Sequence, residues 1–117
     1  MKRVNGKVLE FIEYVVAQTA AIQNGDFHTA NRHAVRYVRA FETLTARGDS
    51  GRDLFVPLLS HERADVRAMA AAFLLRYRHD TARSVLEEVS RGEGLTAFAA
   101  GETLLRWEEG SWHLDPG

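Results

Sequence analysis

The sequence contains no cysteine, only two prolines and no long apolar run. Without cysteine, the chain has no disulfide bond, no thiolate nucleophile and no sulfur ligand for a metal. A membrane-spanning helix needs roughly 20 predominantly apolar residues. The apolar stretch near the start is interrupted by Glu10 and Glu13, which also argues against a secretory signal. We therefore expect a cytoplasmic protein without membrane association.

The 117 residues are 45% hydrophobic and 26% charged, with a formal net charge of −1. This balance is that of an ordinary soluble globular domain. It argues against a disordered tail and against a protein that binds polyanions over its whole surface. We expect one domain spanning residues 1–117.

Scarce proline and plentiful alanine, leucine and arginine favour an all-helical fold. Apolar residues at three- and four-residue steps predict a first helix over about residues 5–23, which ends at the Asn24-Gly25-Asp26 turn. Asp26 is the expected N-cap of a second helix, which closes at Gly48. The apolar stripe of that helix is Phe27, Ala30, Ala34, Tyr37, Val38, Phe41 and Leu44. The two helices should form an antiparallel hairpin over about 5–47.

The rest of the chain contains an internal repeat. A shift of thirty residues lays residues 55–77 over 85–107 without a gap, so that Leu59 meets Val89 and Ala70 meets Ala100. A fixed period of this length indicates stacked helical hairpins. We expect helices at about 52–60, 63–77, 80–91 and 95–108, which form hairpins over about 52–77 and 80–108. A C-terminal cap over 109–117 would cover the open end of the stack, with contributions from Trp107, Trp112 and Leu114.

One segment resembles a HEAT repeat. The matching residues are Leu54, Pro57, Leu58, Leu59, the Asp65-Val66-Arg67 triplet, Ala70, Ala71 and Leu74. The following unit departs from the pattern, because it lacks the proline and has Leu95-Thr96-Ala97 in place of the triplet. The resemblance implies an all-α fold, a short right-handed solenoid of about three stacked helical hairpins (HEAT/armadillo-like).

Most of the chain also resembles a family of short bacterial all-helical proteins of unknown function with a HEAT or armadillo-like repeat fold. The matching residues are Asn31-Arg32-His33-Ala34, Asp65-Val66-Arg67, Gly94-Leu95, Ala99, Trp107 and Gly110. This resemblance implies no activity, since none is assigned to that family.

Motifs that suggest an enzyme have simpler interpretations. The segment from Gly48 to Gly51 spells a serine-protease nucleophile motif, but a helix cap is the better interpretation of it. His61-Glu62-Arg63-Ala64-Asp65 is one substitution from the zinc-protease motif, but no third ligand is signalled nearby. Glu10 and Glu13 are not distinguished from a solvated helix face. We expect no catalytic residue, no metal, no cofactor and no enzymatic activity.

Charge is unevenly distributed along the chain. Residues 32–83 carry ten basic and six acidic residues, a net charge of +4, whereas residues 84–117 carry two and seven, a net charge of −5. In HEAT arrays the second helix of each hairpin lines the concave face, so the resemblance implies one basic concave surface. Asn31 should be half-buried at the edge of the apolar stripe of the second helix, where it either bonds internally or faces a ligand. The candidate partner-binding residues are Asn31, Arg32, Arg36, Arg39, Arg63 and Arg67.

This surface predicts a non-enzymatic protein–protein interaction module with an acidic protein partner, because guanidinium groups suit carboxylates. Size and fold suggest an immunity-type or adaptor protein. The alternative is nucleic-acid binding through phosphates, although the acidic C-terminal third would repel a phosphate backbone. A third interpretation is a solvated arginine face paired with Glu42, Glu62 and Asp65. Head-to-tail self-association is also compatible with the two opposite charges, and added salt would weaken it.

Overall fold

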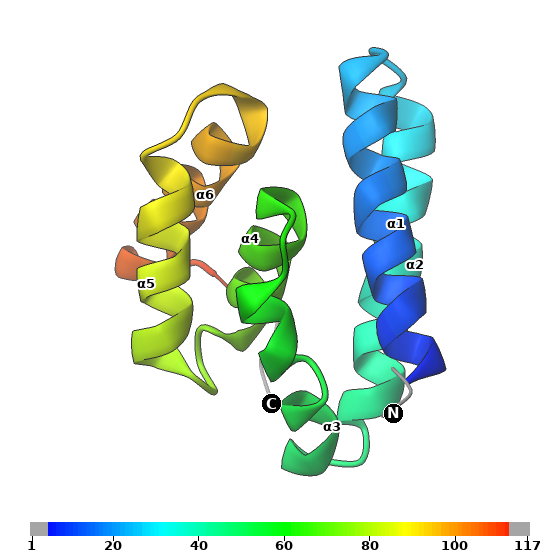
Figure 1. Cartoon of the computed structure of the whole chain (residues 1–117), viewed down its shortest axis with the longest axis vertical. Helices are drawn as coiled ribbons and strands as arrows, with labels where there is room; N and C mark the ends of the chain where they lie inside the picture. Colours follow the sequence, from blue (N-terminus) through cyan, green and yellow to red (C-terminus); the bar gives the residue numbers. More distant parts are fainter. Residues whose placement is uncertain (1–4, 113–117) are drawn as a thin grey trace. The chain divides into compact units, whose positions relative to one another are not determined.

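The computed structural model describes residues 5–112. Within that range the chain forms six α-helices and one 3-10 helix, and no β-strand (Figure 1), so the all-α prediction is confirmed. The elements are α1 (Gly6–Gln23), α2 (Phe27–Thr45), α3 (Asp49–Asp53), η1 (Val56–Ser60), α4 (Ala64–Leu74), α5 (His79–Ser90) and α6 (Gly94–Glu108). They belong to two compact units, an N-terminal unit (Met1–Phe55) and a C-terminal unit (Val56–Gly117). That residues 1–117 act as one domain stays a prediction.

The N-terminal unit is a helical hairpin. Helices α1 and α2 lie antiparallel along their full lengths (Figure 1), as the sequence predicts. The turn between them uses Gly25 at a φ of 73°, a left-handed conformation that favours glycine. The Asp26 carboxylate accepts a hydrogen bond from the Thr29 amide at 3.1 Å, which confirms the expected N-cap. Hydrogen bonds from Thr29 hold the pKa of Asp26 below its usual range.

Aromatic side chains form the core of this unit. The Phe11 ring lies edge-on to Tyr37 and Phe55, with ring centroids 5.7 and 5.2 Å apart. Phe41 also contacts Phe55, at a centroid distance of 4.9 Å. Edge-to-face aromatic pairs stabilise a core beyond the burial of their area. Through Phe55, the last residue of the N-terminal unit, the core therefore connects α1 and α2 to the chain that follows α3.

The predicted helix over 52–60 is wrong. The structure has the short helix α3, a break at Leu54 and Phe55, and then the 3-10 helix η1. Pro57 explains why a single α-helix does not run through this segment, because proline has no amide hydrogen to donate to the carbonyl oxygen of Asp53, four residues earlier. Helix α3 also begins three residues earlier than predicted, directly after Gly48, which has a φ of 87°. The prediction of a helix over 63–77 is also too long, because α4 ends at Leu74.

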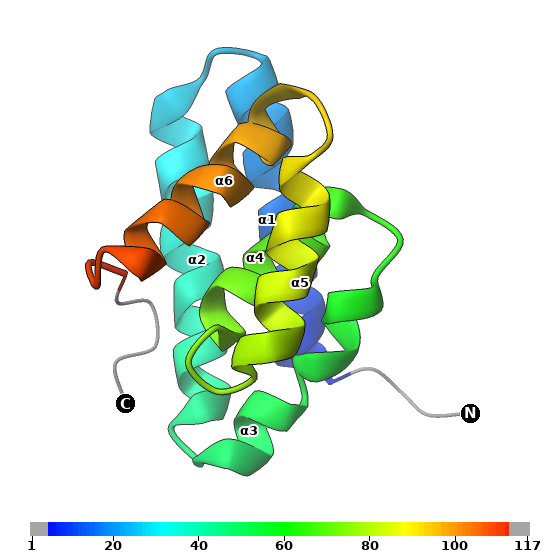
Figure 2. The ribbon, with the colours of Figure 1, turned by 90° about the vertical axis from the view of Figure 1, so that its left-hand side faces the viewer.

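The C-terminal unit packs α4 against both α5 and α6, while η1 lies against α4 (Figure 2). Its buried apolar side chains come from every element, and they include Leu58, Leu59, Val66, Ala70, Phe73, Leu74, Ala82, Leu86 and Ala100. Alanine is frequent among the buried residues of α4 and α6, and its small side chain permits close approach of helices.

Two pairs of element boundaries in this unit are thirty residues apart. Helix α4 begins at Ala64 and α6 begins at Gly94, while η1 ends at Ser60 and α5 ends at Ser90. The two connecting turns are therefore separated by the period of the predicted repeat. The elements before them differ, because η1 is a five-residue 3-10 helix and α5 has twelve α-helical residues.

Trp112 attaches the end of the described chain to α4. Its indole Nε1 donates a hydrogen bond to the Ala72 carbonyl oxygen at 2.9 Å. The last carbonyls of a helix have no partner within the helix, so this bond satisfies a group that needs one. Trp107 instead lies against the His79 ring at a centroid distance of 5.5 Å. Leu114, expected to complete the cap, lies outside the described residues.

Replacing Trp112 with phenylalanine should lower the free energy of unfolding by about 1 kcal/mol, because the Ala72 carbonyl loses its donor while most of the ring packing remains. Urea unfolding followed by far-UV circular dichroism measures this change. Trp107→Phe is the matched control, since among the described residues the Trp107 indole nitrogen donates no hydrogen bond. An equal decrease in the free energy of unfolding of the two variants would contradict a specific role for the hydrogen bond from the Trp112 indole.

Candidate interaction surface

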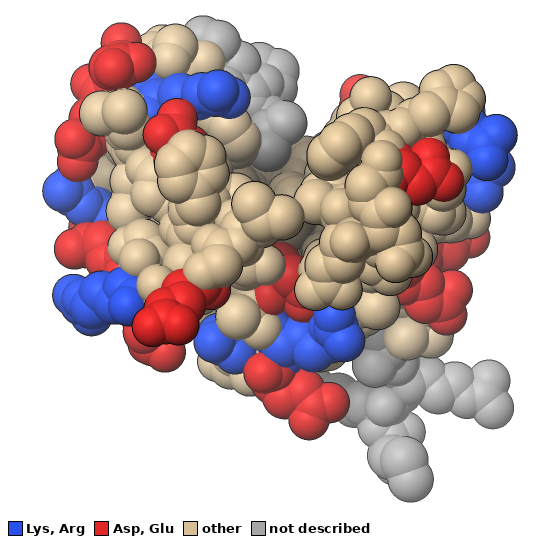
Figure 3. All heavy atoms as spheres, turned by 90° about the horizontal axis from the view of Figure 1, so that it is seen from above, with Lys and Arg blue, Asp and Glu red and all other residues tan. Residues whose placement is uncertain are grey.

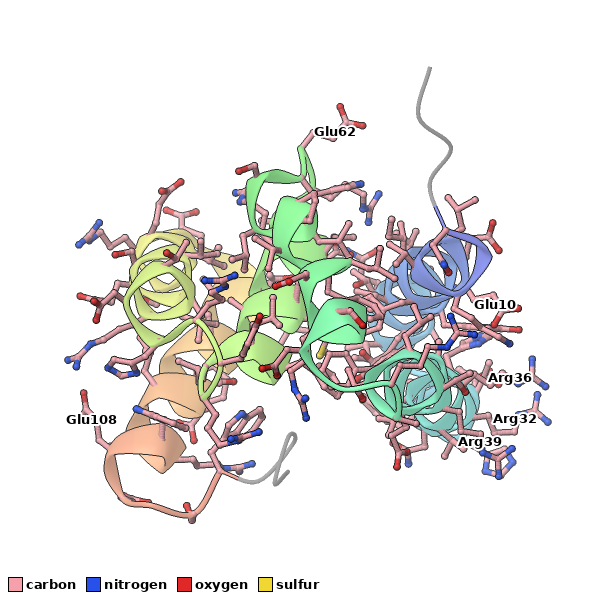
Figure 4. The ribbon with its side chains drawn as sticks, turned by 90° about the horizontal axis from the view of Figure 1, so that it is seen from below. Glu10, Arg32, Arg36, Arg39, Glu62 and Glu108 are labelled. Atoms are coloured by element: carbon pink, nitrogen blue, oxygen red, sulfur yellow. The ribbon has the colours of Figure 1, made fainter. Side chains whose placement is uncertain are left out.

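Three arginines lie on one side of α2. Arg32, Arg36 and Arg39 are all exposed, and their side chains point outward in the same direction from the helix (Figure 4). With about 100° per residue, the three positions fall within an arc of about 60°. Arg32 and Arg39 are seven residues apart, which corresponds to about 10 Å along the axis. The helical spacing read from the sequence is therefore realised as one face.

No described carboxylate lies within ion-pair distance of these three arginines. Arg36 has a different contact, because its guanidinium lies over the Tyr14 ring at 5.5 Å from the centroid. Tyr14 also stacks on His33, with centroids 6.0 Å apart. The aromatic contact restricts Arg36 without neutralising it. The face thus presents three positive charges, none of which has an ion-pair partner among the described residues.

Asn31 is exposed, so the prediction of a half-buried amide at the edge of the stripe is wrong. The apolar stripe begins one turn later than predicted, because Phe27 is 63% exposed and Ala30 is the first buried residue of α2. Asn31 therefore needs no internal partner and remains available on the surface beside the arginines.

Arg63 and Arg67 belong to the C-terminal unit and make internal contacts. Arg63 forms a bidentate pair with Asp65, with both N–O distances at 3.0 Å, which raises the pKa of the guanidinium. Arg67 Nη1 donates to the carbonyl oxygens of His61 and Glu62 at 2.8 and 3.1 Å. Both arginines thus support the turn that opens α4. That they join the α2 arginines in one concave surface stays a prediction.

The carboxylates proposed to neutralise the arginines behave differently from one another. Asp65 pairs with Arg63, as the solvated-face interpretation expects. Glu42 is exposed on α2 and forms no ion pair with the α2 arginines, and Glu62 projects away from the turn before α4 (Figure 4). Of the predicted arginines, Arg63 therefore forms an ion pair with a described carboxylate, whereas Arg67 bonds to backbone carbonyl oxygens.

The residues of the near-match to the zinc-protease motif have structural roles. His61 Nδ1 accepts a hydrogen bond from the Arg63 amide at 3.0 Å, and Asp65 is bound to Arg63. Glu10 pairs with Lys7 at 3.1 Å. Among residues 5–112, no group of three or more potential ligand side chains is placed to hold a metal ion.

Helix α6 carries an exposed apolar stripe that was not predicted from the sequence. Leu95, Phe98 and Leu105 are 62%, 68% and 49% exposed, whereas the opposite side of the helix buries Ala97, Ala100 and Thr103. Figure 3 views the C-terminal unit from the end where α5 leads into α6, and uncharged atoms cover the middle of that end inside a rim of charged residues. The signal in the sequence is that α6 has apolar residues on two sides, and only one side can face the core of its unit.

The described elements define an all-helical protein, and none of its helices is long and apolar enough to span a membrane. The fold is similar to the crystal structure of the protein RPA1889 from Rhodopseudomonas palustris CGA009. The similarity covers 95% of this chain and 93% of that chain, with a TM-score of 0.84 and 23% sequence identity. At that identity the likeness shows the fold alone. No family model and no curated protein matches the sequence.

Proposed function

We propose that this chain is a non-enzymatic protein–protein interaction module that binds an acidic protein partner through the arginine face of α2. The observation that carries the proposal is the set of three exposed arginines, Arg32, Arg36 and Arg39, with no described carboxylate in ion-pair range. Each guanidinium offers five donors in a planar fork that fits a carboxylate. Asn31 adds an amide donor and acceptor beside them.

The proposal includes the finer fold assignment. The chain would be a short HEAT-like repeat protein of the bacterial family that its sequence resembles, acting in the cytoplasm as an immunity-type or adaptor protein. The equivalent turns before Ala64 and Gly94 support the repeat. Arg63 and Arg67 remain further candidate partner-binding residues of the proposal.

Protein is a better partner than nucleic acid for this face. The acidic C-terminal segment, where residues 84–117 carry a net charge of −5, would repel a phosphate backbone. A protein surface can instead carry charges that complement both the basic α2 face and the acidic C-terminal segment. Nucleic-acid binding is the competing outcome of the test below.

The test is a pull-down from a lysate of the cells that produce the protein, at low and high salt. We expect wild type to recover a specific protein that Arg32→Glu with Arg39→Glu no longer recovers, and that high salt releases. These two changes leave the contact between Arg36 and Tyr14 intact. The matched control is Arg91→Glu with Arg106→Glu, which changes the net charge equally at two exposed sites of the C-terminal unit.

Retention of the partner by the control and its loss by the α2 variant would support the proposal. Equal capture by all three proteins would overturn it. Recovery of nucleic acid that nuclease treatment removes, with no protein left on the column, would establish the phosphate-binding alternative instead.

A further inference from the structure

Two acidic residues, the half-buried Glu102 and the exposed Glu109, lie on the same side of α6 as the exposed apolar stripe. Leu95, Phe98, Glu102, Leu105 and Glu109 fall within an arc of about 80° on the helix, of which Glu109 is the C-cap residue. No described cation lies within ion-pair distance of Glu102 or Glu109. Large exposed apolar residues grouped in this way mark an interaction site more often than scattered ones do.

The exposed face of α2 is the counterpart of this stripe. Val35 is 50% exposed beside the arginines, so this face also mixes an apolar side chain with charges, here of positive sign. Arginine stems cover apolar surface, and their guanidinium planes stack on aromatic rings such as that of Phe98. The two faces therefore fit each other in both apolar character and charge.

The spacing of the charges also agrees. Arg32 and Arg39 are seven residues apart on α2, and Glu102 and Glu109 are seven residues apart on α6. Both separations correspond to about 10 Å along a helix axis. Two helices lying side by side can therefore form both ion pairs at once.

Pairing of α6 with the α6 of another copy is less favourable. In an antiparallel α6 pair centred on the stripe, Glu102 would face its own equivalent between the apolar residues. Like charges placed together in an interface cost binding energy, whereas the α2 arginines neutralise the same carboxylates. The charge pattern thus selects α2 as the surface that covers α6.

We propose that the partner of the α6 stripe is a second copy of this chain, which it binds through the α2 arginine face of that copy. This inference rests on the proposed function, since it names one acidic partner of the α2 face. The contact is heterologous, because different surfaces meet, so association continues beyond a dimer until a ring closes or a chain forms.

The test measures the sedimentation coefficient of the full chain over a range of protein concentrations at low ionic strength. We expect the coefficient of wild type to rise with concentration past that of a dimer, and to fall back to the monomer value in about 0.5 M salt. Arg32→Glu with Arg39→Glu should abolish the rise, and so should Glu102→Arg with Glu109→Arg.

All four changes in one chain restore the opposite charges with their positions exchanged. This quadruple variant has the wild-type net charge, and we expect it to associate again. Phe98→Ser provides a second, uncharged variant at a highly exposed position and should also weaken association at least tenfold. Far-UV circular dichroism checks that each variant is folded.

A wild-type chain that stays monomeric at every concentration would overturn the inference, while capture of an acidic protein in the pull-down would still support the proposed function. Association that persists in the α2 variant would indicate an α6–α6 contact and would also overturn it. Loss of association in both double variants, with recovery of association in the quadruple variant, would establish the α2–α6 contact.

Discussion

Replacing Gly51 with alanine is expected to lower the free energy of unfolding by about 3 kcal/mol, the upper end of the usual cost of overpacking. Gly51 is buried in α3, where that short helix meets the C-terminal end of α2. A Cβ added at Gly51 would lie 2.5 Å from the Leu44 carbonyl carbon and closer still to its oxygen. Backbone atoms cannot move aside as a flexible side chain can, so α3 would have to shift away from α2.

The experiment compares the urea midpoints of wild type, Gly51→Ala and Gly101→Ala by far-UV circular dichroism. Gly101 lies inside α6, and the nearest atom to an added Cβ there is the Ser90 Cβ at 3.9 Å, an ordinary contact. The Gly101 change should therefore raise stability by about 0.5–1 kcal/mol, since alanine favours a helix over glycine. A stable Gly51→Ala protein would show that the close approach of α3 to α2 is not required.

Truncating Phe11 to alanine is expected to cost about 3–5 kcal/mol, the range for removal of a buried aromatic side chain. Phe11 is 0% exposed and contacts Tyr37 on α2 and Phe55 at the end of the unit. Its removal leaves a cavity between all three segments, and it removes both edge-to-face pairs. Because small domains are stable by only about 5–15 kcal/mol, this loss would be a large fraction of the total stability.

Thermal and urea unfolding by circular dichroism measure the Phe11→Ala effect, and two controls define its cause. Phe11→Leu keeps much of the volume and should cost clearly less. Phe98→Ala removes the same ring from an exposed site and should change stability by no more than about 0.5 kcal/mol. Similar losses for Phe11→Ala and Phe98→Ala would contradict the assignment of Phe11 to the core.

The sequence predicts the first hairpin well because its signals are local and agree with one another. Apolar spacing, the turn glycine and the capping Asp26 all place the helix boundaries at the same residues, and α1 begins and ends within one residue of its predicted range. The region after Gly48 is different. Its structure depends on the contact of Gly51 with the backbone of α2, a tertiary constraint that periodicity does not report.

The candidate site is also predicted only in part, because some of its features follow from local helix geometry and others depend on tertiary contacts. The common face of Arg32, Arg36 and Arg39 follows from helical geometry alone. The internal bonds of Arg67 depend on where the turn before α4 directs the carbonyls of His61 and Glu62, which no spacing rule specifies. The outward stripe of α6 was missed because its apolar residues were assigned to the stack of hairpins, although the helix has two apolar sides.

The contact of Trp112 with α4 also has a spectroscopic consequence. Both tryptophans of the chain, Trp107 and Trp112, belong to the C-terminal unit, and the N-terminal unit contains none. Their fluorescence therefore reports the environment of the C-terminal unit alone, whereas circular dichroism sums the helices of both. Melting curves from the two signals coincide only when the units lose structure together, so the natural chromophores already distinguish one cooperative transition from two.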